Sequence, residues 1–222
     1  MYLGNGDGTF EHSALYQYPL QGLGRQLLSG DFNGDGKLDL ILLQTPEIGV
    51  NQVGIGLWFL QGNGDGTFKT PRKIAAFPGD GICVGGDSDA VVQVSDFNGD
   101  GKLDLAFCNQ AQIGVMMGNG DGTFQPPTYY LADPTGQRLF TYAIGDINSD
   151  GKPDLVVSEN SDFNNRFVTF LGNGDGTFRA PQTLASGISG AETGIVLGDF
   201  NDGGLLDTIF LNGGGMYLFS QQ

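Results

Sequence analysis

The feature that most constrains the fold is a nine-residue segment, DFNGDGKLD at residues 31–39, which carries oxygen-bearing side chains at regular intervals. These are Asp31, Asn33, Asp35 and Asp39, and Gly34 and Gly36 lie on either side of Asp35. The glycines permit a sharp turn that brings the side chains toward one point. Carboxylates that converge in this way repel one another unless a cation lies among them. Because Ca²⁺ prefers several oxygen ligands in a flexible ring, we interpret the segment as a calcium loop.

The segment recurs at residues 96–104 (DFNGDGKLD), 146–154 (DINSDGKPD) and 199–207 (DFNDGGLLD). A metal-free turn rich in Asp, Asn and Gly would explain a single copy, but not carboxylates at the same offsets three times. In the last copy Gly203 replaces the third acidic position and Asp202 is displaced by one residue. We therefore expect three Ca²⁺ sites and a fourth that is weak or empty. With the lysine backbone carbonyl as a further ligand, the predicted metal residues are Asp31, Asn33, Asp35, Lys37, Asp39, Asp96, Asn98, Asp100, Lys102, Asp104, Asp146, Asn148, Asp150, Lys152, Asp154, Asp199, Asn201 and Asp207.

A second motif, GNGDGTF, alternates with these loops. Its copies begin at Gly4, Gly62, Gly118 and Gly172, which are 58, 56 and 54 residues apart. Asn-Gly and Asp-Gly pairs between apolar runs predict tight hairpins. We predict that the Asp of this motif serves the turn, with a ligand role as the alternative. We also expect its Thr-Phe pair to start the next strand.

A period of about 55 residues with two kinds of turn predicts a repeat architecture. The strand after each metal loop is apolar on both faces, as expected of a sheet packed between two others. An EF-hand is excluded because a helix is absent and Leu42 stands where a bidentate Glu is required. Four antiparallel strands per unit form the blade of a β-propeller. The expected strands are 23–32, 38–44, 54–61 and one from 67; 90–97, 103–109, 113–117 and one from 123; 140–147, 155–159, 167–171 and one from 177; and 195–200, 206–211 and 216–219.

Length and charge limit the alternatives. The 222 residues suffice for one domain, residues 1–222, and the 39 glycines suit many tight turns. The net charge of −15 argues against nucleic acid and against an anionic membrane surface. No apolar run of transmembrane length and no signal peptide is present. Cys83 and Cys108 leave one bridge or two free thiols open.

The two motifs together resemble the FG-GAP/VCBS repeat family over essentially the whole chain. The resemblance implies an all-β fold, a calcium-binding β-propeller like that of integrin α-subunits, with each metal loop joining the first two strands of a blade. It implies Ca²⁺ as the bound ion and an extracellular or cell-surface location in a bacterium. Members occur in surface proteins, in lectins and as accessory domains of larger enzymes.

The number of repeats departs from the family, whose propellers usually have seven blades. This chain holds about four four-stranded antiparallel blades and begins inside a repeat, which suggests an excised or mature fragment. The last repeat lacks a fourth strand, and Thr9-Phe10 could complete it, so we expect pairing of the N- and C-terminal strands to close the ring. A homodimer that completes a larger ring, or a piece of a longer array, are the alternatives.

Three functions are considered for this chain. We favour a non-enzymatic, calcium-stabilised module for adhesion, binding or scaffolding, with an unknown protein or glycan as its partner. A lectin-like module is the alternative, in which Tyr129, Tyr130 and Tyr142 could stack on a sugar, while Trp58 is expected in the core. An enzyme is the third candidate, in which Glu47, Glu159 and Glu192 fall in loops where a carboxylate pair for glycoside cleavage could assemble. The accessory domain of a polysaccharide-active enzyme is a further alternative. The single histidine, His12, is expected at the surface.

Overall fold

The computed structural model describes residues 2–12, 23–45, 55–77, 92–109, 111–132, 138–160, 165–188, 192–212 and 215–221. All regular elements among them are β-strands. No helix in this part of the chain is long and apolar enough to cross a membrane. Two compact units can be distinguished, Met1–Gly79 with Gly120–Thr123, and Asp80–Asn119 with Phe124–Gln222. The prediction of a single domain over residues 1–222 stays a prediction.

The first unit contains a short hairpin and one complete sheet. The N-terminal hairpin pairs β1 (Tyr2–Gly4) with β2 (Phe10–His12) around the first GNGDG turn. The sheet that we name the first sheet has the order β3-β4-β5-β6, and all of its strands are antiparallel. Its strands are β3 (Leu23–Gly30), β4 (Asp39–Thr45), β5 (Ile55–Leu60) and β6 (Arg72–Phe77).

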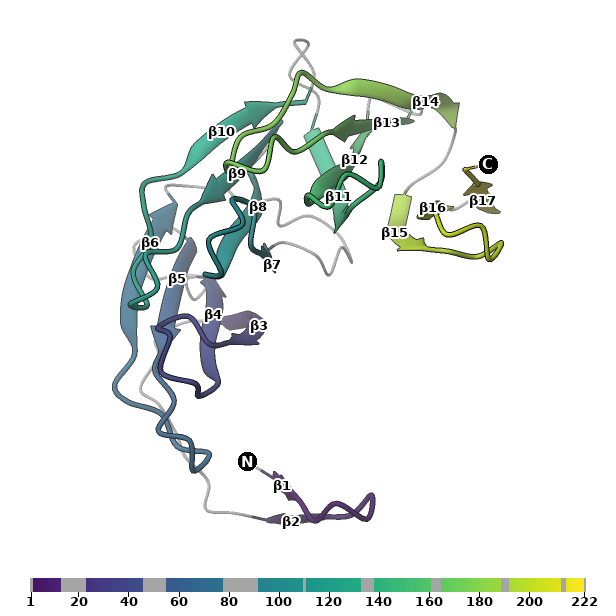
Figure 1. The fold of residues 1–222 in the computed structure, drawn as a ribbon. Helices are drawn as coiled ribbons and strands as arrows, with labels where there is room; N and C mark the ends of the chain where they lie inside the picture. Colours follow the sequence, from purple (N-terminus) through teal and green to yellow (C-terminus); the bar gives the residue numbers. More distant parts are fainter. Residues whose placement is uncertain are drawn as a thin grey trace. The chain divides into compact units, whose positions relative to one another are not determined.

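The second unit contains three further antiparallel sheets, and Figure 1 shows their strands side by side within each sheet. The second sheet consists of β7–β10, the third of β11–β14 and the fourth of β15–β17. The order in each sheet follows the chain, as expected for strands joined by hairpins. The strands are β7 (Val92–Ser95), β8 (Asp104–Asn109), β9 (Gln112–Met116), β10 (Thr128–Leu131), β11 (Arg138–Gly145), β12 (Asp154–Asn160), β13 (Asn165–Phe170), β14 (Gln182–Ile188), β15 (Glu192–Gly198), β16 (Asp207–Asn212) and β17 (Gly215–Phe219).

The strand after each of the first three metal loops is buried on both faces, as the sequence predicts, whereas Leu211 in β16, after the fourth loop, is 50% exposed. In β12, Leu155 and Val157 join a core that also contains Ile113 of the second sheet. Val156, which points to the opposite face, packs in a separate cluster with Phe210 of the fourth sheet. The third sheet is therefore packed between two neighbouring sheets within the second unit.

The start of the fourth strand differs from the expectation. Phe68, Phe124 and Phe178 form only isolated bridges, and the strands that follow begin at Arg72, Thr128 and Gln182. A proline directly precedes each of these strands, and proline has no N–H to donate to a ladder. The Thr-Phe pair therefore ends the turn instead of starting the strand.

The predicted pairing of the N- and C-terminal strands is not among the pairings of the described residues. There β2 pairs with β1, and the fourth sheet has the three strands β15, β16 and β17. Closure of a ring by these strands stays a prediction.

Candidate metal centre

Each predicted metal loop joins the first two strands of its sheet, as the resemblance implies. The first loop turns at Gly34 and Gly36, whose φ angles are +73° and +78°. Such angles are readily accessible only to glycine and a few short polar residues. Accordingly, Ser149 and Asp202 stand at the position of Gly34 in the third and fourth loops, with φ angles of +57° and +56°.

The first three ligand positions are oriented by the loop backbone. One carboxylate oxygen of Asp31 accepts a hydrogen bond from the Gly34 N–H and the other from the Gly36 N–H, both at 2.8 Å. The side-chain oxygen of Asn33 accepts from the Asp35 N–H at 2.8 Å. Asp35 in turn accepts from the Lys37 N–H at 3.0 Å. These short-range bonds fix the direction of each side chain before any ion is bound.

The last aspartate of each loop is buried and binds two backbone N–H groups from different segments. The side chain of Asp39 is 0% exposed; it accepts from Phe32 N at 3.1 Å and from Gly62 N, in the GNGDG turn, at 2.8 Å. We call this arrangement the aspartate clamp. The same clamp is formed by Asp104 with Phe97 and Gly118, by Asp154 with Ile147 and Gly172, and by Asp207 with Phe200 and Gln221.

Burial raises the pKa of the clamp carboxylates Asp39, Asp104 and Asp154. For Asp39 the charges of Asp35 and Asp31 raise the pKa further. A cation held between these groups would remove that repulsion. The charge pattern of the loop is therefore the one that favours a bound cation.

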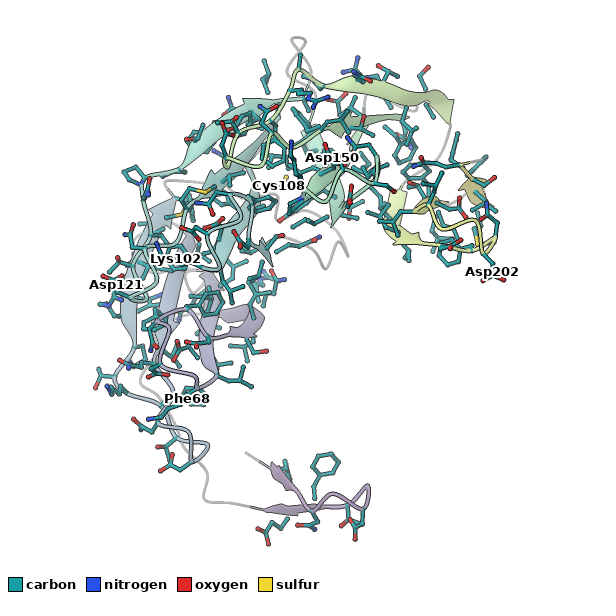
Figure 2. The ribbon with its side chains drawn as sticks, in the orientation of Figure 1. Phe68, Lys102, Cys108, Asp121, Asp150 and Asp202 are labelled. Atoms are coloured by element: carbon teal, nitrogen blue, oxygen red, sulfur yellow. The ribbon has the colours of Figure 1, made fainter. Side chains whose placement is uncertain are left out.

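Lysine supplies part of the positive charge in two loops. The ammonium of Lys102 lies 3.2 Å from the Asp100 carboxylate, and Lys152 lies 3.9 Å from Asp150 (Figure 2). The Lys102 backbone N–H is the largest cause of the lowered pKa of Asp100. Because these pairs are exposed, they contribute little to stability.

The loops bring the predicted residues into one turn, but the carboxylates do not converge closely. Among the described residues, no three His, Cys, Asp or Glu side chains are gathered at a distance that would hold a metal ion. In the first loop the Asp31 and Asp39 oxygens face backbone N–H groups, and the Asp35 carboxylate accepts from Gln61 Nε2 at 3.3 Å. The donor set nevertheless consists of oxygen atoms alone, on a backbone that already turns around them, and this fits Ca²⁺ better than a metal that prefers nitrogen or sulfur.

The fourth loop keeps the backbone but loses a ligand. Asp199 accepts from the N–H groups of Gly203 and Gly204, as Asp31 does in the first loop. Gly203 stands at the third ligand position, while Asp202 lies at the outer tip of the loop (Figure 2). The displaced acid therefore occupies the turn position of Gly34, and the expectation of a weak or empty site stays a prediction.

The GNGDG turns contact the metal loops and donate a hydrogen bond to the aspartate clamp. In the turn at residues 62–68, the Asp65 carboxylate accepts both the N–H and the hydroxyl of Thr67. This is the turn role that the sequence favours for this aspartate. A Cβ on Gly62 would overlap the Leu38 carbonyl oxygen, so only glycine can approach the clamp here. The stem of Lys37 packs against Gly64 in the same turn.

The tyrosines that were candidates for sugar stacking have three different environments. Tyr142 is buried, and its hydroxyl donates to the Ala106 carbonyl at 2.7 Å, which removes it from any surface site. Tyr130 donates to the Gly176 carbonyl and packs edge-on against Phe178. Tyr129 is 40% exposed. The half-buried ring of Trp58 lies near the Lys73 ammonium, 5.8 Å from it.

The carboxylates considered for catalysis are not brought together among the described residues. Glu159 is buried and accepts from Arg166 Nε at 2.7 Å. Glu47 lies outside the described residues, and of His12 and Glu192 only the backbone is described. Cys108 is buried and disulfide-bonded, while Cys83, the only other cysteine, lies outside the described residues.

The clamp and its partner glycine were not predicted from the sequence as a unit. The available signal was the regular alternation of the two motifs, in which each DxNxDGxxD loop is followed by one GNGDGTF turn. Gln221, which takes the place of the turn glycine at Asp207, has no such signal because it lies outside both motifs.

Comparison with known proteins gives a family and several structural relatives, two of which are described below. The family profile described as an FG-GAP-like repeat matches residues 1–42, 96–157 and 146–210, more than half of the chain. No curated protein matches the chain significantly. A lectin of Agrocybe aegerita, described by its specific recognition of non-reducing terminal N-acetylglucosamine, has 18% identity and a TM-score of 0.50. The match covers 98% of this chain and 73% of the lectin.

The exotype rhamnogalacturonan lyase YesX is the second structural relative, with 17% identity and a TM-score of 0.56. The match covers 89% of this chain but only 40% of the lyase. At these identities the likeness concerns the fold alone. Together with the antiparallel sheets and the repeat match, it assigns the chain to the β-propeller class.

Proposed function

The chain belongs to the FG-GAP-like repeat family, and on that premise we propose that it is a calcium-stabilised, non-enzymatic propeller module that binds a protein or glycan outside the cell. The observation that carries the proposal is the repeated loop, in which the backbone orients three oxygen-bearing side chains beside a buried aspartate. A bound Ca²⁺ would neutralise carboxylates that otherwise repel one another.

The ion would be held by the first three loops. In the first loop Asp31, Asn33, Asp35 and Asp39 would supply side-chain oxygens and Lys37 its carbonyl, with the equivalent residues in the second and third loops. Binding to the folded chain but not to the unfolded one stabilises the fold, by about 1.4 kcal/mol per site at ten times Kd. Affinities near 10⁻⁴ to 10⁻³ M are typical of extracellular modules.

The disulfide at Cys108 supports an extracellular or cell-surface location, because such bonds are rare in the reducing cytosol. The net charge of −15 supports a partner other than nucleic acid. The buried ion pair of Glu159 with Arg166 supports a non-enzymatic role, because this carboxylate is 2% exposed. Whether the module acts as a monomer or as a homodimer belongs to the same proposal.

Calcium titration tests the metal proposal. We expect calorimetry to give three bound ions, and we expect EGTA to lower the melting temperature. Asp35→Asn, Asp100→Asn and Asp150→Asn should each remove one ion, because each changes the third ligand of one loop. Asp202→Asn is the matched control, since this acid lies outside the ligand positions, and it should leave the stoichiometry unchanged. A melting temperature that is equal in Ca²⁺ and EGTA would refute the proposal.

A carbohydrate-binding role is the second candidate, and the exposed ring of Tyr129 favours it. The lectin relative shares only the fold, so the ligand has to be found directly. A glycan array probed with wild-type protein and with Tyr129→Ala tests this role. Tyr217→Ala, which removes another partly exposed tyrosine on β17, is the control. Binding that persists in Tyr129→Ala, or no binding by the wild type, would remove Tyr129 from consideration.

A further inference from the structure

The backbone of Phe97, in the second metal loop, is held by two different segments of the chain. Its N–H donates to Asp104, the last aspartate of the same loop, at 2.9 Å. Its carbonyl accepts from the Gly176 N–H, in the GNGDG turn of the third sheet, at 3.2 Å. Phe97 shares these two peptide groups with the predicted ligands Asp96 and Asn98, so its position fixes where both ligand side chains start. The second loop is therefore held partly by a turn that belongs to the next sheet.

The second residue of the metal loop is held from outside in two further loops. In the first loop the Phe32 carbonyl accepts from the Gly122 N–H at 2.9 Å. In the third loop the Ile147 carbonyl accepts from Gln221 Nε2 at 2.9 Å. The donor is a turn glycine in one case and a side-chain amide in the other, but the acceptor position is the same. The contact is thus a regular part of the loops.

The turn that contains Gly176 is anchored to the third metal loop at its other end. The Gly172 N–H donates to Asp154, the last aspartate of the third loop, at 2.7 Å. The stem of Lys152, in the same loop, packs against Gly174 of the turn. One turn therefore contacts two metal loops, the third loop through its first residues and the second loop through Gly176.

Hydrogen bonds within the turn connect these two ends. The Asn173 N–H donates to the Thr177 carbonyl at 2.9 Å, and Asn173 Nδ2 donates to the Thr177 hydroxyl at 2.9 Å. The Thr177 N–H donates to the Asp175 carboxylate, also at 2.9 Å. A turn closed by three such bonds moves as one body, so a restraint on Gly172 also restrains Gly176.

Buried side chains keep the turn against the second sheet. The Phe178 ring packs edge-to-face on Phe97 and on Tyr130, with ring centres 5.6 and 5.2 Å apart. The Tyr130 hydroxyl donates to the Gly176 carbonyl at 3.3 Å. Gly176 is therefore held through both its N–H and its carbonyl. All of these residues belong to the second unit, so the connection between the two loops lies within one compact body.

We propose that Ca²⁺ binding to the second loop and to the third loop is positively coupled through the turn at residues 172–178. The inference rests on the proposed function, because it concerns the ions that these loops hold. An ion in the third loop restrains Asp154 and, through the Gly172 N–H, the turn that supports Phe97. The second loop then loses less conformational freedom when its own ion binds, which raises its affinity.

Direct interaction between the two ions would have the opposite sign. Two cations repel each other, and salt screens this repulsion over a Debye length of about 8 Å at physiological ionic strength. Repulsion would therefore make the second ion bind more weakly when the first is present, whereas the turn makes it bind more tightly. The sign of the coupling distinguishes the two mechanisms.

An NMR titration with Ca²⁺ measures the affinity of each loop separately. The Gly101 N–H donates to Asp96 in the second loop at 2.8 Å. The Gly151 N–H donates to Asp146 in the third loop, also at 2.8 Å. Because each of these amides is bonded to a predicted ligand, its chemical shift reports the occupancy of its own loop.

Variants that empty one loop test the coupling. Asp150→Asn removes the third ligand of the third loop and should weaken Ca²⁺ binding at the second loop at least about five-fold. Asp100→Asn should weaken binding at the third loop by a similar factor, because coupling between two ligands is reciprocal. Asp202→Asn removes one negative charge from the fourth loop outside the ligand positions. As the matched control, it should leave the affinity of the second loop unchanged.

Two further variants test the route through the turn. Tyr130→Phe removes the hydroxyl that holds the Gly176 carbonyl, and Phe178→Leu removes the edge-to-face contacts. Neither residue belongs to a metal loop or to the aspartate clamp. In each background, adding Asp150→Asn should change the second-loop affinity less than it does in the wild type. Tyr129→Phe, on the same strand as Tyr130, is the control and should keep the full effect; circular dichroism in EGTA shows whether the strands are retained.

Three results would overturn the proposal. The first is equal second-loop affinity in the wild type and in Asp150→Asn. The second is tighter binding in Asp150→Asn, which is the sign expected of direct repulsion. The third is undiminished coupling in both Tyr130→Phe and Phe178→Leu, since the coupling would then use another route. Ions that bind to the loops independently leave the proposed function standing, whereas a wild type that binds no Ca²⁺ would overturn both.

Discussion

Asp104 illustrates how a single side chain can serve both architecture and a metal loop. One of its oxygens accepts from Phe97 N at 2.9 Å and the other from Gly118 N at 2.7 Å. The two donors belong to the metal loop and to the GNGDG turn. The carboxylate therefore connects the two motifs before any contribution from an ion, and replacing it should cost stability even without calcium.

Replacing Asp104 by Asn tests this role. The amide keeps one oxygen but turns an NH₂ group toward a backbone donor, and a buried donor left unsatisfied costs roughly 1–3 kcal/mol. We expect Asp104→Asn to lower the free energy of unfolding by this amount in EGTA, measured by urea denaturation. Asp100→Asn, at an exposed position of the same loop, should cost little in EGTA and reduce only the stabilisation by Ca²⁺. Equal losses for both variants in EGTA would contradict the clamp.

The stability of the fold is expected to depend on pH through Asp175, which lies in the GNGDG turn of the third sheet. The Thr177 hydroxyl and then its N–H lower the pKa of this carboxyl, through hydrogen bonds of 2.5 and 2.9 Å. Because the folded pKa lies below the unfolded value, the stabilisation is complete above about pH 4 and is lost as the pH falls through the folded pKa. Thr177→Val should raise the pKa of Asp175 in an NMR titration of the side-chain carboxyl. Thr183→Val, on the exposed part of β14, should leave it unchanged.

At the scale of elements, the first glycine of the GNGDG turn is as important as the hairpin, because it allows the turn to approach the metal loop closely. A Cβ on Gly118 would overlap the Leu103 carbonyl oxygen, and the same holds for Gly62 with Leu38 and Gly172 with Pro153. The absence of a side chain allows the turn to lie against the metal loop. The loop and the turn thus form one structural element, although they are separated in the sequence by a complete pair of strands.

Gly118→Ala should therefore be strongly destabilising. The inserted methyl group meets backbone atoms, which yield less easily than a side chain, and overpacking of this kind costs about 1–3 kcal/mol. Gly194→Ala in β15 is the control, because the added Cβ has no neighbour within 4 Å. Urea denaturation of both variants measures the difference. A Gly118→Ala variant as stable as Gly194→Ala would show that the turn does not depend on this close approach.

The sequence predicts the elements well where a motif bounds them. The strand expected at 103–109 is β8 (Asp104–Asn109), and the loop before it begins and ends as the repeated aspartates require. In the first three sheets the fourth strand starts later than the sequence predicts, because the proline after GNGDGTF interrupts the ladder. The clamp, and the hydrogen bond from the Gly122 N–H to the Phe32 carbonyl, could not be inferred because they depend on distances between segments that no residue pattern encodes.

For the molecule as a whole, the disulfide at Cys108 is expected to add stability to the second unit. Closing the loop to Cys83, the only other cysteine, would contribute about 3 kcal/mol in the chain-entropy description. We expect dithiothreitol to lower the melting temperature. Cys83→Ser and Cys108→Ser should reproduce the loss and become insensitive to the reductant. A disulfide-linked dimer on a non-reducing gel would instead show that the bond joins two chains.

Hydrogen bonds between a GNGDG turn and the metal loop of the preceding repeat also bear on how such chains change in length during evolution. In two cases the turn of one repeat donates to the metal loop of the repeat before it, Gly122 to Phe32 and Gly176 to Phe97. Duplication or loss of one whole repeat therefore leaves matching surfaces at the new boundary and creates no mismatch. Unequal recombination between nearly identical GNGDGTF codons would yield relatives with different repeat numbers, all joined by the same hydrogen bonds.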